Sequence, residues 1–415
     1  MTYTTRIRRG TVAACTALVL ALGAAAPALA GDTQPHVATY TQQHTQRGEL
    51  IASTPLSKLT SAELTKFLEG RDMDASTVRH GVRAYRLTYR TVDPQGQPTT
   101  ATGLFVLPDS KRQRLDLVSD THGTMVHRDY APSVGEDFGR VAPYLHASAG
   151  RAVAAPDYLG LGKGPGKHPY MDTKSAVTAS VDMLRAARSA ARQQGRTLTG
   201  DVYATGFSQG GQVAMALGKE LERGVDRHFR LRALAPVGGP YDLEGEEVPA
   251  VFDGRVNDIS AIFYVSYFLV AQNRLHGIYQ DPSEVFRAPY ADRVEALFDG
   301  EHQEEDIVKQ LPGTVKELLT PEFYERMQHP TGVLLDVLRS NSDSCGWGPK
   351  APVRLYAGAA DTDVPIANAR SCAADLADHG VRAPVLDQGP VDHFGSFKAA
   401  SPKIVRWFSE LQQGR

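Results

Sequence analysis

Residues 206–210, with the sequence Gly-Phe-Ser-Gln-Gly, constrain the fold of this chain more than any other segment. A short β-rich run, residues 202–205, precedes them, and apolar residues recur at helical spacing over residues 212–223. This order predicts a buried strand, a sharp turn and a helix. Gly206 and Gly210 have no side chain to separate the strand from the helix, so the two elements can approach closely. Such a turn displays the serine between them.

That serine, Ser208, is the candidate nucleophile. The backbone amide of Gln209 would lie at the N-terminus of the helix, where it can stabilise an oxyanion. A Gly-X-Ser-X-Gly run also occurs by chance in glycine-rich loops, but the flanking strand and helix favour a nucleophile. Because a serine hydroxyl is a weak nucleophile at neutral pH, the hypothesis requires a histidine base and an acid, in the chain order serine, acid, histidine.

The candidates for the base and the acid lie near the C-terminus. His393 is expected in a loop after the last predicted strand, from which it can reach Ser208. Asp361 comes three residues after Gly358, which ends a predicted strand, so its carboxylate is expected at the top of the sheet. Asp363 is the main alternative acid, although it can instead cap the next helix. Two minor alternatives for the acid are Asp242 and Asp392.

A second oxyanion donor is expected from the loop after the predicted strand at residues 115–119. There, Gly123 lets the backbone fold under the site, and the amide of Thr124 is the candidate donor. His122 precedes the nucleophile in the chain, so we expect it to stabilise this loop rather than to act as the base. Asp157, in a later glycine-containing loop, is expected to accept hydrogen bonds from backbone amides of that loop and to support the site.

Short β-rich runs alternate with longer helical patterns along the chain, which predicts βαβ units and a mostly parallel sheet flanked by helices. Residues 85–91 and 100–107 are expected to form a hairpin, because residues 93–96, Asp-Pro-Gln-Gly, supply turn chemistry. Together with the serine turn, this order predicts an α/β-hydrolase fold. Further predicted strands span residues 151–155, 231–237, 353–357 and 384–386, and the longest predicted helices span residues 173–194 and 396–412.

More than a hundred residues between Val237 and Val353 show helix-like periodicity and no strand alternation, which predicts an inserted helical cap. Residues 259–275 are rich in apolar side chains, as expected of a helix that is buried on most sides or lines an apolar pocket, although packing alone explains them equally well. Residues 301–323 are more polar and are expected to face solvent. The expected organisation is a signal peptide over 1–30, a first core part with an N-terminal extension over 31–240, the cap over 241–350 and a second core part over 351–415.

Residues 1–30 differ from the rest of the chain. Three arginines make a basic start, residues 11–26 are apolar, and small residues before Gly31 suit cleavage. The apolar run is rich in Ala and short for a membrane-spanning helix, which needs about 20 residues. We therefore expect a signal peptide cleaved near Ala30, a secreted mature chain and no stable membrane insertion. A lipid anchor at Cys15 is a weaker alternative, because it leaves a very short apolar stretch before it.

The composition, 42% hydrophobic and 22% charged over 415 residues, is that of a globular protein. Loss of the three N-terminal arginines would move the formal charge from -2 to -5, which is too mild to identify a partner. No segment clusters Lys and Arg among aromatic residues, so nucleic acid is not an expected partner. The mature chain keeps Cys345 and Cys372, which are expected to form a disulfide in an oxidising compartment, with two buried free thiols as the alternative.

Five short segments follow one another along the chain. They are His122-Gly123-Thr124, Pro-Asp-Tyr-Leu-Gly-Leu-Gly at residues 156–162, Gly-Phe-Ser-Gln-Gly-Gly at 206–211, Asp-Thr-Asp-Val-Pro at 361–365 and Asp392-His393. In this order they resemble the secretory lipase family within the α/β-hydrolases, over most of the mature chain. The resemblance implies a triad of Ser208, Asp361 and His393 beneath a helical insertion, with Thr124 and Gln209 at the oxyanion hole. It also implies carboxylic ester substrates, including acylglycerols.

Hydrolysis of carboxylic esters through an acyl-enzyme is the leading prediction, with a small-molecule or lipid ester as substrate and no metal or organic cofactor. A secreted serine exopeptidase with the same triad is the alternative. It needs a charged anchor for a peptide terminus, for which Glu244, Glu246 and Glu247 are candidates, although an exposed acidic loop is the commoner explanation. A noncatalytic binding protein has no need of nucleophile, acid, base and oxyanion loop together. The sequence indicates neither the acyl chain length nor the oligomeric state.

Overall fold

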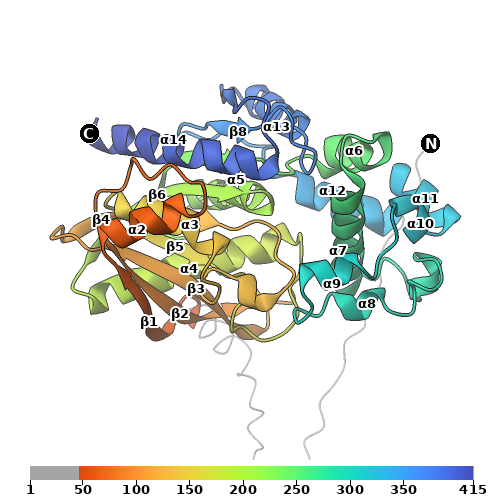
Figure 1. Ribbon diagram of the computed structural model, residues 1–415, viewed down its shortest axis with the longest axis horizontal. Coiled ribbons are helices and arrows are strands. Elements are labelled where there is room, and N and C mark those ends of the chain that lie inside the picture. Colours follow the sequence, from red (N-terminus) through yellow and green to blue (C-terminus); the bar gives the residue numbers. More distant parts are fainter. Residues whose placement is uncertain (1–45, 415) are drawn as a thin grey trace, which may run out of the picture. The chain divides into compact units, whose positions relative to one another are not determined.

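A single sheet organises the computed structural model, which describes residues 46–414. Within these residues nine strands pair in the order β1-β2-β3-β5-β4-β6-β7-β8-β9 (Figure 1). The predicted signal peptide and the alternative lipid anchor at Cys15 lie outside the described residues. The strands are β1 Leu50–Leu59, β2 Val82–Val92, β3 Pro98–Pro108, β4 Arg114–Thr121, β5 Ala152–Pro156, β6 Thr197–Phe207, β7 Arg230–Val237, β8 Leu355–Ala357 and β9 Val385–Asp387.

The sheet is antiparallel at one end and parallel elsewhere. β1, β2, β3 and β5 pair antiparallel in that order, whereas the pairs from β5 and β4 through to β9 are parallel. The predicted mostly parallel sheet is therefore confirmed, and the predicted hairpin is β2 and β3, in which Leu87 pairs with Gly103. The sequence pattern does not predict β1, because none of its side chains is fully buried and Pro55 interrupts it. Such a strand is typical of a sheet edge.

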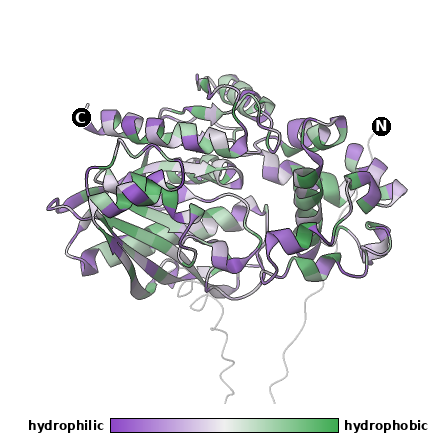
Figure 2. Cartoon of the chain, in the orientation of Figure 1, coloured by the Kyte–Doolittle hydropathy of each residue, from purple (hydrophilic) through white to green (hydrophobic). Residues whose placement is uncertain are grey.

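Helices cover both faces of the sheet. Successive residues of β4 point to opposite faces: Leu117 packs in a cluster with α4 and α5, and Val118 packs in a cluster with α3 and α14. The predicted helix at residues 173–194 is α4. Figure 2 shows the central strands largely in green, because they are buried between these two layers. The helices outside the β7–β8 connection are α2 Ser61–Glu69, η1 Arg128–Tyr130, η2 Phe138–Arg140, α3 Val141–Ser148, α4 Thr173–Gln193, α5 Gln209–Glu222, α13 Ala367–Asp378 and α14 His393–Gln413.

The connection between β7 and β8 is helical, as predicted, and adds no strand to the sheet within the described residues. We call residues 243–342 the helical insertion. Its apolar side chains form a cluster together with Val126, Tyr170 and Met171. α7 is buried along most of its length, although Ile259 is 65% exposed (Figure 2). Its helices are η3 Leu243–Glu247, α6 Val248–Asp253, α7 Asp258–His276, η4 Pro282–Glu284, α8 Val294–Leu297, α9 Glu304–Val308, α10 Val315–Leu318, α11 Pro321–Gln328 and α12 Gly332–Ser342.

A disulfide joins Cys345 to Cys372, as predicted. Cys345 follows α12, and Cys372 lies within α13, so the bond ties the end of the helical insertion to the helix that packs against β8. Both cysteines are fully buried. Across residues 46–414, no helix combines the length and the apolar character that a membrane span requires.

Candidate active site

Ser208 is the single residue between β6 and α5. β6 ends at Phe207 and α5 begins at Gln209, while Ser208 has φ 58° and ψ −128°. Non-glycine residues rarely adopt this backbone conformation, which costs about 1–3 kcal/mol and persists where the surrounding structure enforces it. The expected start of the helix at residue 212 was wrong, because the glycines that resemble turn residues form its first turn. The amide of Gln209 therefore lies at the N-terminus of α5.

Close packing against β4 explains the glycines on both sides of Ser208. A Cβ atom on Gly206 would overlap the hydroxyl of Thr121, and a Cβ atom on Gly210 would overlap the carbonyl of Thr121. The Thr121 hydroxyl donates a hydrogen bond to the Gly210 carbonyl, at 2.7 Å. Strand and helix thus meet at the end of β4, as the glycine spacing predicts.

His393 and Asp361 form a buried pair. Nδ1 of His393 donates to Oδ2 of Asp361 at 2.7 Å, and the other oxygen, Oδ1, accepts from the backbone amides of Asp363 and Val364 at 2.9 Å each. Nε2 of His393 is buried and has no hydrogen-bond partner among the described residues. With its proton on Nδ1, the imidazole presents an acceptor at Nε2. His393 is the first residue of α14, so the expected loop position was wrong.

The end of β7 brings the serine close to this pair. The Ser208 amide donates to the carbonyl of Val237 at 2.9 Å. A Cβ atom on the next residue, Gly238, would lie 3.3 Å from Cε1 of His393 and 3.6 Å from Oδ2 of Asp361. The ring of Phe207 is centred 4.4 Å from the His393 ring. His393 and Asp361 thus lie beside Gly238, and Ser208 is hydrogen-bonded to the residue that precedes this glycine.

The alternative acids have other partners. Oδ1 of Asp363 accepts from Asn257 Nδ2 at 2.7 Å and from Ser260 Oγ at 2.8 Å, which ties the start of α7 to the loop of Asp361. The expectation that Asp363 caps the next helix was wrong, because the N-cap of α13 is Ile366. Asp242 and Asp392 accept from backbone amides at the starts of η3 and α14.

A cavity of about 630 Å³, including space open to solvent, connects Ser208 with both predicted oxyanion donors. Thr124 and Gln209 line it, and Gly123 lies so near the serine that its Cβ atom would be 3.0 Å from the Cβ atom of Ser208. The remaining lining residues are mostly apolar and come largely from the helical insertion: Tyr170, Met171, Pro240, Leu243, Glu247, Val248, Val251, Tyr264, Val265, Phe268, Met327, Leu338 and Val364.

No protein-family model and no curated protein matches the chain, whereas several solved structures are similar to it. A variant of the rice cell wall degrading esterase LipA from Xanthomonas oryzae is 30% identical, with a TM-score of 0.77, over 89% of this chain and 99% of that one. The chain belongs to the α/β-hydrolases. A protein from Legionella pneumophila assigned as a hydrolase shares the fold at 24% identity and a TM-score of 0.81, over 88% and 98% of the two chains. Candida antarctica lipase A shares it at 14% identity and 0.60, over 85% and 79%.

Buried polar groups support the predicted oxyanion loop, residues 122–124, of this α/β-hydrolase. His122 lies between the carbonyl of Gly123, 2.7 Å from Nδ1, and the carbonyl of Asp157, 3.2 Å from Nε2, which agrees with the expected stabilising role. Burial lowers the pKa of His122. The carboxylate of Asp157 accepts from the amide of Ser133 at 2.9 Å and from the hydroxyl of Thr102 at 2.6 Å. The expectation that its donors lie in its own glycine loop was therefore wrong.

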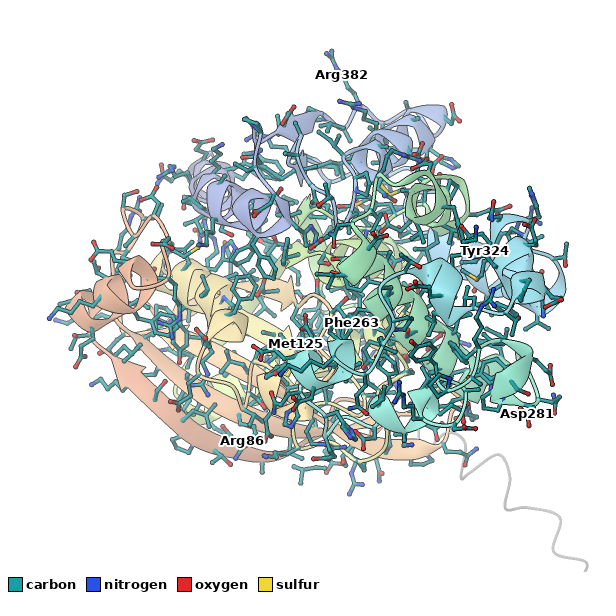
Figure 3. All side chains as sticks on the ribbon, turned by 45° about the vertical axis from the view of Figure 1, so that its right-hand side comes forward. Arg86, Met125, Phe263, Asp281, Tyr324 and Arg382 are labelled. Carbon is teal, nitrogen blue, oxygen red and sulfur yellow. A yellow bond between two sulfur atoms is a disulfide. The ribbon has the colours of Figure 1, made fainter. Side chains whose placement is uncertain are left out.

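Sequence reasoning missed Tyr170. Its hydroxyl lies 2.9 Å from Oγ1 of Thr124, and its ring stacks on Tyr267 of α7 with 4.1 Å between the ring centres. The hydroxyl of Tyr267 donates to the carbonyl of Met125 at 3.2 Å; Met125 is labelled in Figure 3, as is Phe263 of α7. Tyr170 thus links the oxyanion loop to the helical insertion, and only its position after the glycine loop gave any hint of this in the sequence.

Proposed function

We propose that this chain is a serine hydrolase of carboxylic esters. The buried pair of His393 and Asp361 is the main support for the proposal, because Nε2 of His393 has no hydrogen-bond partner among the described residues. Ser208 has a strained backbone conformation directly before the N-terminus of α5. An imidazole held in this tautomer can accept the serine proton as the hydroxyl attacks a carbonyl carbon. Similarity to an esterase and to a lipase supports the same reaction class.

In this mechanism Ser208 Oγ bonds to the acyl carbon, and its proton passes to Nε2 of His393. Asp361 stabilises the imidazolium that forms. The tetrahedral oxyanion accepts hydrogen bonds from the backbone amides of Gln209 and Thr124. His393 then protonates the departing alcohol as the ester bond breaks, which leaves an acyl-enzyme. Water then bonds to the acyl carbon and passes a proton to His393, which returns it to Ser208 Oγ as the acyl-enzyme bond breaks and the acid departs.

The cavity wall favours esters over peptides. Glu244 and Glu246 form ion pairs with Arg339 and Arg255, so they are not free to anchor a peptide amine. Glu247 lines the cavity, but burial raises its pKa to about 8, which leaves it mostly neutral at pH 7. A neutral carboxyl is a poor partner for an ammonium group.

The proposed function is tested with p-nitrophenyl esters of graded chain length and a panel of aminoacyl-nitroanilides. Ester turnover that disappears in Ser208→Ala supports the esterase, and the best chain length reports the depth of the cavity. Anilide cleavage with little ester turnover would instead identify a peptidase. Failure of a serine-directed phosphonate to label Ser208 would identify a noncatalytic binding protein.

We further propose that the enzyme is exported after cleavage near Ala30. The basic and apolar segments of residues 1–30 and the Cys345–Cys372 disulfide support this, because disulfides persist in oxidising compartments. N-terminal sequencing of the protein recovered from culture medium tests the cleavage position. Retention of the full chain in the cell would contradict it.

A further inference from the structure

The cavity beside Ser208 has one ionisable carboxyl in its wall. Glu247 is the sole acid among the lining residues, and its neighbours Val248, Val251 and Phe268 are apolar. Removing a carboxyl from water costs free energy unless hydrogen bonds replace the lost water. Within residues 46–414, the side chain of Glu247 has one such bond, from Nδ2 of Asn368 to Oε2 at 2.7 Å. The second oxygen, Oε1, accepts no hydrogen bond from the described residues.

Asn368 holds this carboxyl in a fixed position. It is 1% exposed, and its Oδ1 accepts from the backbone amide of Asp242 at 3.2 Å. Its Nδ2 donates to Glu247 at 2.7 Å and to the carbonyl of Pro365 at 3.5 Å. Glu247 itself lies at the junction of η3 and α6, whose backbone positions it. A polar group held on one side and open on the other is pre-organised for binding, because little freedom remains to be lost.

The protonation state of the Glu247 carboxyl limits which ligand groups can bind to it. Burial is the main cause of its raised pKa of about 8; Asp361 and Asp363 add to it, while Asn368 and Arg255 oppose it. The carboxyl is therefore protonated at pH 7 and ionised in alkaline solution. An ammonium ligand suits the ionised form alone, whereas a hydroxyl both donates and accepts and so pairs with either form.

We propose that Glu247 selects ester substrates that carry a hydroxyl group on the portion that enters this cavity. The inference rests on the proposed function, because Ser208 lines the same cavity. The hydroxyl exchanges a hydrogen bond with Oε1 of Glu247, while the hydrocarbon part of the same portion packs against the valines and Phe268. Glu247 binds the substrate away from the reacting atoms and is a specificity-determining residue.

Matched esters test the inference. One pair is p-nitrophenyl hexanoate and its ω-hydroxy counterpart, which places the hydroxyl on the acyl portion. The other is the butyl and ω-hydroxybutyl esters of one acid, which places it on the alcohol portion. We expect kcat/KM to favour the hydroxylated member of one pair by about tenfold, the usual effect of one hydrogen bond. Glu247→Leu should bring the ratio of kcat/KM between the hydroxylated and the plain member of that pair to about one.

Glu244→Leu is the matched control, because Glu244 is a near neighbour that pairs with Arg339 and does not line the cavity. It should keep the preference. A wild-type ratio of kcat/KM near one between hydroxylated and plain esters in both pairs would overturn the inference, even if Glu247→Leu does not fold. A preference for an ammonium-bearing ester, without one for the hydroxylated ester, would also overturn it. In either case, normal turnover of the plain esters would leave the proposed function standing. No turnover of any ester would overturn both.

Discussion

The turn at Ser208 and the cavity wall formed by the helical insertion are built in different ways. At the turn, backbone contacts between β4, β6 and α5 leave no space for a Cβ atom on Gly206 or Gly210. In the cavity wall, side chains from several short helices pack against one another, and individual positions such as Val248 and Val251 are only partly buried. The turn fixes atoms through the backbone, whereas the wall fixes a shape through side chains.

This difference assigns separate roles to the two regions. Close backbone packing tolerates almost no substitution, which suits groups that must be held in a fixed position for catalysis. A side-chain wall can change its residues while keeping its volume, which suits the choice of substrate. We therefore expect substitutions at the turn and triad to lower kcat, and substitutions in the wall to change the ratio between substrates.

The largest expected effect is that of Ser208→Ala. Removal of the nucleophile should lower kcat for p-nitrophenyl esters by about 10⁵-fold, by analogy with other serine hydrolases. Ser266→Ala is the control, because among residues 46–414 the Ser266 hydroxyl bonds only to the carbonyl of Ile262 within α7. Comparable turnover by the two variants would contradict the expectation that the turn sets kcat and the cavity wall sets the choice of substrate.

The next effect separates the two aspartates of the acid loop. Asp361→Asn should lower kcat by about 10⁴-fold, because the amide no longer accepts the Nδ1 proton of His393 and favours the wrong tautomer. Asp363→Asn should lower it by less than about tenfold, since Asp363 bonds to Asn257 and Ser260 instead. The reverse order, measured by steady-state kinetics, would make Asp363 the acid.

A smaller effect is expected where the two regions meet. Tyr170→Phe removes the hydrogen bond to the Thr124 hydroxyl but keeps the ring stacked on Tyr267. One neutral hydrogen bond corresponds to about a tenfold change at most, so kcat should fall by about three- to tenfold with KM little changed. A change confined to KM would mean that Tyr170 contributes to substrate binding in the cavity wall and does not position the predicted oxyanion loop.

The smallest effect concerns stability and pH at Glu247. Its pKa is raised from 4.5 to about 8 in the folded protein, so the folded state holds this proton more tightly than the unfolded state does. That contribution to stability is complete below about pH 4.5 and is lost as pH rises through about 8. Glu247→Gln should therefore melt near the wild-type temperature at pH 5 and roughly 2 °C or more above it at pH 9. A parallel pH dependence in both proteins would contradict the raised pKa of this carboxyl.

Local signals were sufficient for several elements and failed for others. The hairpin and α4 follow from turn chemistry and helical spacing. The start of α2 also has a local signal in the sequence, because Thr60 and Glu63 form a capping box. By contrast, α5 and α14 begin about one turn earlier than expected, since glycines and histidine are weak markers of a helix start.

By itself, the sequence determined the serine turn and the helical nature of the insertion, because each depends on residues close in the chain. It also determined the disulfide pair, because Cys345 and Cys372 are the only cysteines after residue 30. The tertiary structure alone decided the donors to Asp157, the link from Tyr170 to Thr124 and the place of Glu247 in the cavity wall. These contacts join residues far apart in the chain. Packing between layers selects the partners of these residues, and the spacing of residues along the chain does not indicate which side chains will meet.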